Sequence, residues 1–527
     1  MKRHYIFIIL PLLAMVLMAS CSKNELNIQD TGTGSNKNDL VLKSINSGTA
    51  DASFTAFNNT FLHWTGNTAF YQRALYDQVA EGGWVGALEI LALEDVYERT
   101  NDSNHKKLIN DMCNTFLANN APSSWPYNNW NDDIGWMTLA LIRAYQITGT
   151  QNFLTQARYG FDMAWARGWD TQYNDGGIWQ VQPVAGPNPH KDPLANNSLG
   201  KVACYIYQSN GDKWYLDRAN DLYNWAWHHI YDPSTGLVYE KLFTNGTISY
   251  AGQAYNQGTW ADFGYLMFKI TGNTSYRDDA IKAIDYTRNN LTNVGIFSKL
   301  DGYVYTWADE IGRALGHICR SNPYLWDKYW GWMKQNANGA WDNRRTDLNI
   351  SWNAWDTKTP NDVVGTIKFV SALVWLQYTP ETKPTSSVSI ANGTYKIISR
   401  QNGYALDAVG NGTGNNTALD VWPYNGGNNQ KWTLTSLGGG MYKIIGVGSG
   451  RSIDVGGAST SNGAGVILYD YQNSYNQNIY LSSPSSGYYT ITFVHSGMAL
   501  DVNGANNSVD QWPFTAGNNQ QWQFQAP

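Results

Sequence analysis

The chain has 527 residues, among them 24 Trp, 34 Tyr and 50 Gly, whereas only 15% are charged. This length exceeds one ordinary hydrophobic core and predicts two or three domains. A formal net charge of −6, with no segment rich in Lys or Arg beyond the N-terminus, argues against a nucleic-acid-binding surface. The aromatic, mostly uncharged composition suits neutral polymeric ligands, for which carbohydrate is the natural candidate.

The N-terminus has the features of an export signal. A basic start, Met1 to His4, precedes the apolar run Tyr5 to Met18, which is short for a membrane span, and small residues then lead to Cys21. The ending Met-Ala-Ser-Cys resembles a bacterial lipobox. It implies a signal peptide over 1–20, lipidation of Cys21 and a lipid-anchored protein of the bacterial cell envelope, on the outer membrane, facing the periplasm or the surface. An ordinary cleaved signal with an incidental cysteine is the alternative.

Residues 21–50 are rich in Asn, Ser, Gly and Thr without periodicity, which predicts a flexible tether. The lipid anchor would then be the only membrane contact of the protein.

The remaining cysteines, Cys113, Cys204 and Cys319, lie far apart in apolar helical patterns, which predicts buried free thiols. The adjacent His228 and His229 point to different faces of a helix and cannot chelate one ion together. We therefore expect no metal site and no cofactor.

Residues 51–379 read as a series of helices, with apolar residues at three- and four-residue spacing. Similar turns surround Gly149, Gly211 and Gly272, which are 62 and 61 residues apart. That interval fits two helices with their connections and predicts stacked helical hairpins, of which about six would fit. A closed ring is favoured over an open superhelix, because the stretch from Asp133 to Ile147 is apolar on every face.

The pair Asp132 and Asp133 opens that apolar stretch. Asp is a common helix cap, so a bare pair in this position is usually structural. Here Trp130 and Trp136 surround the pair with the flat apolar faces on which sugar rings stack. Cleavage of a glycosidic bond needs one protonated carboxyl and a second carboxylate, and the pair could supply both.

The segment Trp130-Asn-Asp-Asp-Ile-Gly-Trp136, followed by Leu139 to Gly149, resembles the signature of glycoside hydrolase family 76, the endo-acting α-1,6-mannanases. Supporting matches are Asn174 to Trp179, Ala195 to Ser198 and Ala254 to Gly258. The resemblance implies an (α/α)6 barrel and hydrolysis of α-mannan with retention of configuration. It assigns Asp132 as the nucleophile and Asp133 as the general acid and base.

Two amide side chains, Asn256 and Gln257, lie in a glycine-flanked loop and are the best further candidates for contacts with sugar hydroxyls. Ordinary hydrogen bonding within the loop is the alternative for both. Asp175, before two glycines, is predicted to be a turn residue.

A Pro/Ser/Thr-rich linker over 380–390 leads to a separate domain over 391–527. Three copies of one unit follow, in which Asp407, Asp454 and Asp501 are spaced by 47 residues both times. Alternating apolar residues and Gly and Asn turns make each unit β. The pattern resembles the ricin-type β-trefoil lectin domain, so the whole chain is expected to be multidomain, with an all-α barrel followed by an all-β trefoil.

The lectin resemblance implies one sugar pocket in each unit, built from an Asp, an aromatic residue, an Asn and a Gln. The three sets are Asp407, Trp422, Asn429 and Gln430; Asp454, Tyr469, Asn476 and Gln477; and Asp501, Trp512, Asn519 and Gln520. The Gln side chains also have a core role in the trefoil. The second pocket ranks lowest, because Ile467 stands where units one and three have Asp420 and Asp510.

Other functions are open on the sequence alone. A hydrolase or transglycosylase of another α-glycan is the closest alternative. A non-catalytic glycan-capture lipoprotein would need only the lectin units. A polysaccharide lyase would need a basic and aromatic cluster that does not stand out. Nothing in the sequence requires more than a monomer.

Overall fold

The computed structural model describes residues 45–182, 189–298, 307–322, 325–384, 388–438, 441–459, 461–485, 487–512, 514–515 and 517–527. The expected signal peptide, Cys21 and most of the expected tether lie outside these residues. Among the described residues, no helix combines the length and the apolar character that crossing a bilayer requires.

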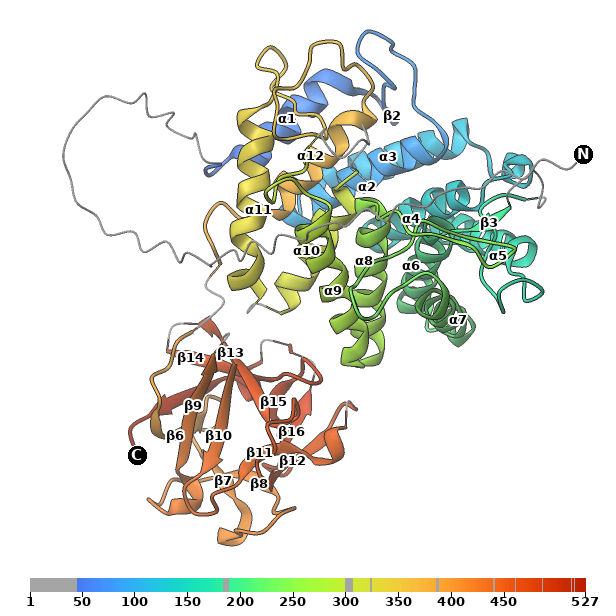
Figure 1. Ribbon diagram of the computed structural model, residues 1–527. Helices are drawn as coiled ribbons and strands as arrows, with labels where there is room; N and C mark the ends of the chain where they lie inside the picture. Colours follow the sequence, from blue (N-terminus) through green and yellow to red (C-terminus); the bar gives the residue numbers. More distant parts are fainter. Residues whose placement is uncertain are drawn as a thin grey trace, which may run out of the picture. The chain divides into compact units, whose positions relative to one another are not determined.

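Six inner helices form a closed ring in the described residues, each contacting the next and the last returning to the first (Figure 1). They are α2 (Gly83–Thr100), α4 (Asn131–Thr148), α6 (Pro193–Asn210), α8 (Ala254–Thr271), α10 (Asp309–Ser321) and α12 (Ile367–Tyr378). An inner helix has neighbours on both sides and a partner outside it, so it must be apolar nearly all round. In α4, a buried run from Ile134 to Ala144 confirms the prediction made for this stretch.

The outer helices each pack on an inner helix. They are α1 (Thr49–Phe61) on α12, α3 (Ser103–Asn119) on α2, α5 (Gln151–Gly168) on α4, α7 (Lys213–His229) on α6, α9 (Thr274–Asn290) on α8 and α11 (Leu325–Asp342) on α12 and α10.

The predicted repeat of glycines marks one end of the ring. Gly149, Gly211 and Gly272 end α4, α6 and α8 with φ of 77°, 73° and 72°, a left-handed conformation that glycine adopts without steric cost. Each turn leads directly to an outer helix. The inner helices therefore run in one direction, and their N-termini gather at the opposite end of the ring.

Short elements cover that N-terminal end. A 3-10 helix, η1 (Pro122–Tyr127), leads into α4, and a three-stranded sheet of β3 (His190–Lys191), β4 (Lys241–Phe243) and β5 (Ile248–Ser249) precedes α6 and α8. A separate hairpin, β1 (Leu62–Thr65) and β2 (Thr68–Tyr71), follows α1.

The C-terminal domain is built on a closed barrel in which each strand pairs antiparallel with the next. Its strands are β6 (Gly393–Ser399), β9 (Trp432–Gly438), β10 (Met441–Gly446), β13 (Asn478–Ser485), β14 (Tyr488–Phe493) and β17 (Trp522–Gln525), which pairs back to β6. Closure leaves no open sheet edge.

Three hairpins complete the domain, one in each repeat. They are β7 (Ala405–Ala408) with β8 (Leu419–Trp422), β11 (Ser452–Val455) with β12 (Ala464–Tyr469), and β15 (Ala499–Val502) with β16 (Val509–Trp512). The barrel and its three hairpins make a β-trefoil. The predicted combination of an all-α ring and a β-trefoil is therefore confirmed.

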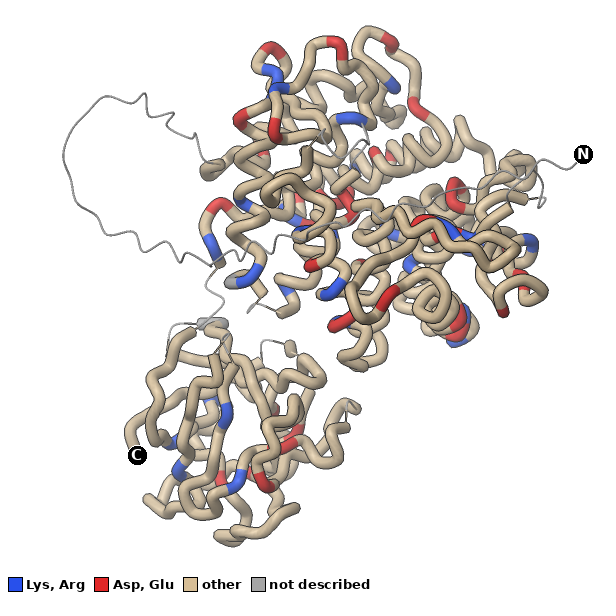
Figure 2. The backbone as a smooth tube through the Cα atoms, viewed as in Figure 1, with Lys and Arg blue, Asp and Glu red and all other residues tan. Residues whose placement is uncertain are grey.

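Charged residues of both signs are spread along the described backbone (Figure 2). Cys113, Cys204 and Cys319 are buried free thiols, as their apolar surroundings in the sequence predict.

Candidate active site

The adjacent carboxylates Asp132 and Asp133 lie in the first turn of α4, at the N-terminal end of the ring. Negative charge is stabilised at this end of a helix, because its first backbone N–H groups have no partners within the helix. The local fold thus permits two acidic groups at the mouth of an otherwise apolar core.

Asp132 is the more buried of the two, at 7% exposed. Burial, and then the charge of Asp133, raise the pKa of the Asp132 carboxyl to about 7. Its Oδ2 accepts a hydrogen bond of 3.0 Å from Nε2 of Gln180. Its Oδ1 is buried and has no hydrogen-bond partner among the described residues. One carboxylate oxygen is therefore fixed by the protein, and the other is left for a ligand.

Asp133 is half-buried and accepts a 3.1 Å hydrogen bond from Nδ2 of Asn128. Oδ1 of Asn128 accepts a 2.9 Å hydrogen bond from the backbone N–H of Trp130, so the same side chain shapes the entry to the helix. Burial raises the pKa of the Asp133 carboxyl as well. Both groups therefore hold protons more readily than free aspartic acid.

A second segment lies beside the start of α4. The backbone N–H of Asn131 donates to Gln180 O at 2.8 Å, and that of Gln182 donates to Asn129 O at 2.7 Å. The fully buried Asn131 side chain donates to Trp179 O at 2.7 Å and accepts from Nε of Arg167, also at 2.7 Å. These contacts hold residues 179–182 against the two aspartates.

The two predicted stacking residues have different surroundings. Trp130, at the N-cap of α4, is 46% exposed and forms an isolated bridge with Val181. Trp136 is 5% exposed and belongs to the helical core. These placements favour a sugar contact for Trp130 and a packing role for Trp136.

The two predicted amides lie in the first turn of α8, so the prediction that they belong to a loop is wrong, and their surroundings differ. Gln257 is fully buried; its Oε1 accepts from Val238 N at 2.7 Å and its Nε2 donates to Gly236 O at 3.3 Å, so it holds a loop. Asn256 is 1% exposed, and its Oδ1 has no partner among the described residues. Asn197 of α6, which was not singled out as a contact, also has a buried Oδ1 without such a partner.

Lys191 holds the loop that contains the glycine-rich segment from Asn174 to Gly177. Its buried ammonium donates to the carbonyls of Asp170, at 2.7 Å, Tyr173, at 2.5 Å, and Gly176, and lies 4.8 Å from the ring centroid of Trp179. Burial lowers the pKa of Lys191 to about 8. The prediction that Asp175 is a turn residue fits its left-handed φ of 54°.

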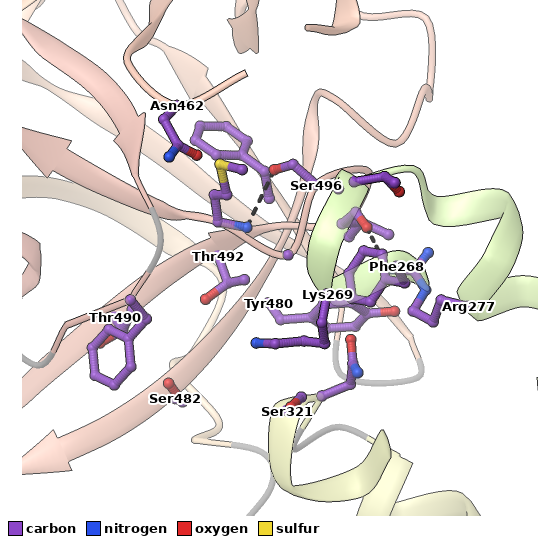
Figure 3. Close-up of a pocket in the computed structure, with 18 of the residues that line it drawn as sticks. Phe268, Lys269, Arg277, Ser321, Asn462, Tyr480, Ser482, Thr490, Thr492 and Ser496 are labelled. Atoms are coloured by element: carbon purple, nitrogen blue, oxygen red, sulfur yellow. Dashed lines mark hydrogen bonds between the residues drawn. The ribbon is translucent and has the colours of Figure 1, made fainter. Parts of the chain in front are cut away.

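Figure 3 shows a cavity of about 760 Å³ whose lining includes neither Asp132 nor Asp133. It is lined in part by Phe268 and Lys269, at the C-terminal end of α8, and by Arg277 of α9. Asp132 and Asp133 lie at the N-terminal end of the ring, so this cavity is not the candidate site. In the described part of the chain, no group of three or more His, Cys, Asp or Glu is placed to hold a metal ion.

The trefoil hairpins bring together the predicted lectin residues. Asn429 donates to Oδ2 of Asp407 at 2.6 Å and Asn519 to Oδ2 of Asp501 at 2.8 Å. In the second unit, Asn476 donates both to Oδ1 of Asp454, at 3.0 Å, and to the carbonyl of Val455, at 3.1 Å. The Asp and Asn of each predicted set are therefore neighbours.

The aromatic residues of these sets are Trp422, 56% exposed, Trp512, 42% exposed, and Tyr469, half-buried. A cavity of about 270 Å³ in the third unit is lined by Asp501, Asp510, Trp512 and Asn519, among others. An exposed indole beside a small polar cavity offers a stacking face to a sugar ring.

The three glutamines of the sets are fully buried: Gln430, Gln477 and Gln520. Their Oε1 atoms accept from backbone N–H groups five residues earlier at 2.8, 2.7 and 2.7 Å. They hold the loop that follows each aromatic residue, which matches the core role considered from the sequence.

Comparisons with known proteins bear on both domains. Residues 48–386 match glycosyl hydrolase family 76. Residues 385–469 and 475–527 match the ricin-type beta-trefoil lectin domain-like family. The mannan endo-1,6-alpha-mannosidase DCW1 of Candida glabrata is 24% identical over 290 residues, which cover 49% of this chain and 64% of that protein. The match thus spans less than two thirds of that relative's length.

Two solved structures share the fold of the helical domain. One is the GH76A alpha-1,6-mannanase of Salegentibacter sp. HEL1_6, solved as an inactive variant with two adjacent aspartates changed to asparagine and in complex with alpha-1,6-mannotriose. It is 21% identical, with a TM-score of 0.55, and the match covers 63% of this chain and 97% of that chain. The family 76 mannosidase Bt3792 of Bacteroides thetaiotaomicron is 17% identical, with a TM-score of 0.52 over 63% and 96%. With the family match over most of its length, the chain belongs to glycosyl hydrolase family 76.

Proposed function

We propose that the protein is an endo-α-1,6-mannanase that hydrolyses the mannan backbone with retention of configuration. The observation that carries the proposal is the pair Asp132 and Asp133 at the mouth of the ring, with Oδ1 of Asp132 buried and without a partner among the described residues. The inactive variant of the Salegentibacter mannanase, changed at two adjacent aspartates, supports the same assignment.

In this mechanism the Asp132 carboxylate attacks the anomeric carbon, while Asp133 gives its proton to the glycosidic oxygen of the leaving chain. A mannosyl ester forms on Asp132 and the C–O bond to the leaving chain breaks. Water then attacks the anomeric carbon of this ester and gives a proton to Asp133. The bond between that carbon and the Asp132 oxygen breaks, which releases the sugar and restores both side chains.

The ionisation of the pair limits this reaction at low pH. Burial favours the proton on Asp132, with its pKa near 7, whereas attack requires Asp132 to be ionised. Positive charge that develops at the anomeric carbon stabilises that carboxylate. We therefore expect kcat/KM to fall as the pH drops below about 7.

Incubation with unbranched α-1,6-mannan, beside an Asp132→Asn variant, tests the proposal. We expect short manno-oligosaccharides from the parent and none from the variant. Product lengths distinguish endo from exo cleavage, and proton NMR of the first products distinguishes α from β anomers. If the folded parent released no sugar from this mannan, the proposed activity would be rejected in favour of hydrolysis of another α-glycan or a purely binding role. Transfer of mannosyl groups to added manno-oligosaccharides would favour a transglycosylase.

We also propose that the trefoil targets the enzyme to glycan through its first and third units. Their exposed Trp422 and Trp512, and the cavity beside Trp512, support this role. Affinity electrophoresis in gels containing α-mannan or a galactose polymer tests it. Retardation of the parent would support the role, and unchanged migration in both gels would contradict it.

The location proposed from the sequence is the bacterial cell envelope, with a lipid on Cys21 after removal of residues 1–20. Metabolic labelling with palmitate, beside a Cys21→Ala variant, tests the anchor. Label in the parent alone is expected, and equal label in both would reject it. For the protein without the anchor we propose a monomer, which sedimentation would check.

A further inference from the structure

Gln180 is held from several directions beside the nucleophile proposed above. Its backbone carbonyl accepts from Asn131 N at 2.8 Å, and its backbone N–H donates to His190 O at 3.3 Å. Its side chain lies between Oδ2 of Asp132, at 3.0 Å, and Nε2 of His190, at 2.6 Å. Both the backbone and the side chain therefore fix the amide in the site.

The chemistry of these groups sets the direction of the hydrogen bonds. A carboxylate only accepts, so an ionised Asp132 requires the NH2 of Gln180 to face it, and Oε1 then faces His190. An oxygen acceptor at 2.6 Å requires a proton on Nε2 of His190. If Asp132 is protonated, the opposite arrangement becomes possible, with the amide turned over and Nε2 of His190 accepting.

The placed atoms correspond to the first arrangement, with Nε2 of Gln180 facing Asp132 and Oε1 facing His190. His190 lies on β3, which pairs with β4, and its ring packs edge-on against Phe243 with centroids 5.7 Å apart. The ring is thereby held in place on the side of Gln180 away from Asp132. An amide between two fixed groups resists rotation, so the NH2 keeps pointing at the carboxylate.

We infer that Gln180, oriented by His190, is a positioning residue that stabilises the ionised form of Asp132 and leaves its Oδ1 facing the reacting sugar. This inference rests on the proposed function. Nothing in the family resemblance or the sequence pattern singled out either residue. The hydrogen bond from Gln180 lowers the pKa of Asp132 against the effects of burial and of Asp133, in line with this role.

Two other carboxyl groups near Asp132 are coupled to its ionisation. Asp133 is adjacent in the helix, and Asp192, the buried N-cap of α6, carries a pKa raised by burial and by the charge of Asp132. Asp192 accepts from Ala195 N at 3.0 Å, which is an ordinary capping contact. Among the described hydrogen bonds, the one from Gln180 is the side-chain bond that favours the charged form of Asp132.

The activity test compares Gln180→Met with the parent on α-1,6-mannan, and uses Gln182→Met on the same segment as the matched control. We expect kcat to fall about 10- to 100-fold, the factor that a hydrogen bond to a charged group supplies, with KM within about twofold. The acidic limb of the kcat/KM profile should move to higher pH, because the Asp132 pKa rises when this bond is lost.

Variants of His190 test whether this residue acts by orienting the Gln180 amide. We expect His190→Phe to shift the profile in the same direction by a smaller amount, and His190→Gln, which keeps an N–H donor, to restore most of the activity. Because His190 acts through the amide, the Gln180→Met, His190→Phe double variant should be no slower than Gln180→Met alone. Additive losses, or an unmoved acidic limb in a folded Gln180→Met protein, would overturn the inference.

A readout without substrate separates this inference from the proposed function. Long-range ¹H–¹⁵N spectra of histidine-labelled protein, assigned with the His190→Gln variant, report which ring nitrogen carries the proton. At a pH above 7, where Asp132 is ionised, a proton on Nε2 of His190 is expected. Nε2 without a proton would refute the positioning role even in an active enzyme, whereas an inactive parent with a protonated Nε2 would reject only the substrate.

Discussion

Nζ of Lys201 lies 2.7 Å from Oδ2 of Asp262 and joins inner helices α6 and α8. Lys201 also lies 2.7 Å from Oε2 of Glu310 in α10. Further buried contacts extend this network to α2, α4 and α12: Arg313 with Asp95, Arg143 with Asp95 and Glu98, and Tyr378 with the same two carboxylates. A single polar network therefore connects all six inner helices in the middle of an apolar ring.

Breaking this network should destabilise the helical domain strongly. Lys201→Met removes the ammonium that Asp262 and Glu310 share, and leaves Asp262 paired with His317 alone and Glu310 with Arg313 alone. Removal of one partner from a buried ion pair costs about 3–5 kcal/mol. The matched control is Lys328→Met, which removes a partly exposed pair with Asp285 at 2.6 Å and should cost about 1 kcal/mol or less. Urea unfolding followed by far-ultraviolet circular dichroism measures both, and equal losses would contradict the network.

His317 makes the stability of this network depend on pH. Its ring contacts Asp262 at 2.7 Å and Glu98 at 3.1 Å, and these carboxylates outweigh burial and raise the pKa of His317 to about 9 from 6.5. A raised pKa means that the folded state holds the proton more tightly. The stabilisation is complete below pH 6.5 and disappears as the pH passes 9.

The measurement is the free energy of unfolding of the parent minus that of His317→Gln, between pH 6 and 10. This difference should shrink as the pH rises. The subtraction is needed because Lys191, with its pKa lowered to about 8, acts in the opposite direction above that pH in both proteins. A constant difference across the range would show that His317 is not charged in the folded protein.

Much of the fold could be predicted because its signals are local. Gly149, Gly211 and Gly272 recur at the ends of three inner helices, and the apolar stretch after Asp133 identifies a helix with neighbours on all sides. Asp132 and Asp133 stood out through a local motif of the family. In the trefoil, the 47-residue repeat placed Asp407, Asp454 and Asp501 in equivalent hairpins.

The rest of the site depends on contacts between distant segments. Gln180 reaches Asp132 from 48 residues further along the chain, and neither Gln180 nor His190 lies in a pattern that indicates a partner. The packing of the helices in the ring also determines which polar side chains face its N-terminal end. Gln257 and Asn256 are neighbours in sequence, yet the Gln257 amide is used by the backbone of residues 236–238, whereas Oδ1 of Asn256 has no partner among the described residues.

The roles of the two aspartates can be separated chemically. Azide can replace the missing carboxylate of an alanine variant, and the configuration of the glycosyl azide reports which role was lost. With an aryl α-1,6-mannobioside as substrate, we expect Asp132→Ala to give the β-azide by direct displacement. Asp133→Ala should give the α-azide, formed through the intermediate on Asp132. The reverse pattern would make Asp132 the acid, the role that its higher tendency to hold a proton favours.

The trefoil offers an internal control for its own binding sites. Asp420 lies directly opposite Asp407 on neighbouring strands, and Asp510 lies opposite Asp501, whereas Ile467 lies opposite Asp454. Like charges in such pairs destabilise a sheet, and the second unit shows that the fold does not need them. Oδ1 of Asp420 and Oδ1 of Asp510 are buried without partners among the described residues, so both can accept hydrogen bonds from a sugar.

We therefore expect the glycan affinity of the trefoil to depend on Trp422 and Trp512 and not on Tyr469. Replacing either Trp by Ala removes a stacking face, which is worth about 1 kcal/mol beyond its buried area, and should weaken binding about tenfold or more at that site. Tyr469→Ala should change binding little, because the Asn476 amide of that unit is already shared between Asp454 and the Val455 carbonyl. Calorimetric titration of the parent and these variants with the retarding glycan measures the number of sites, and a third site lost in Tyr469→Ala would show that the second unit binds sugar without the additional carboxylate.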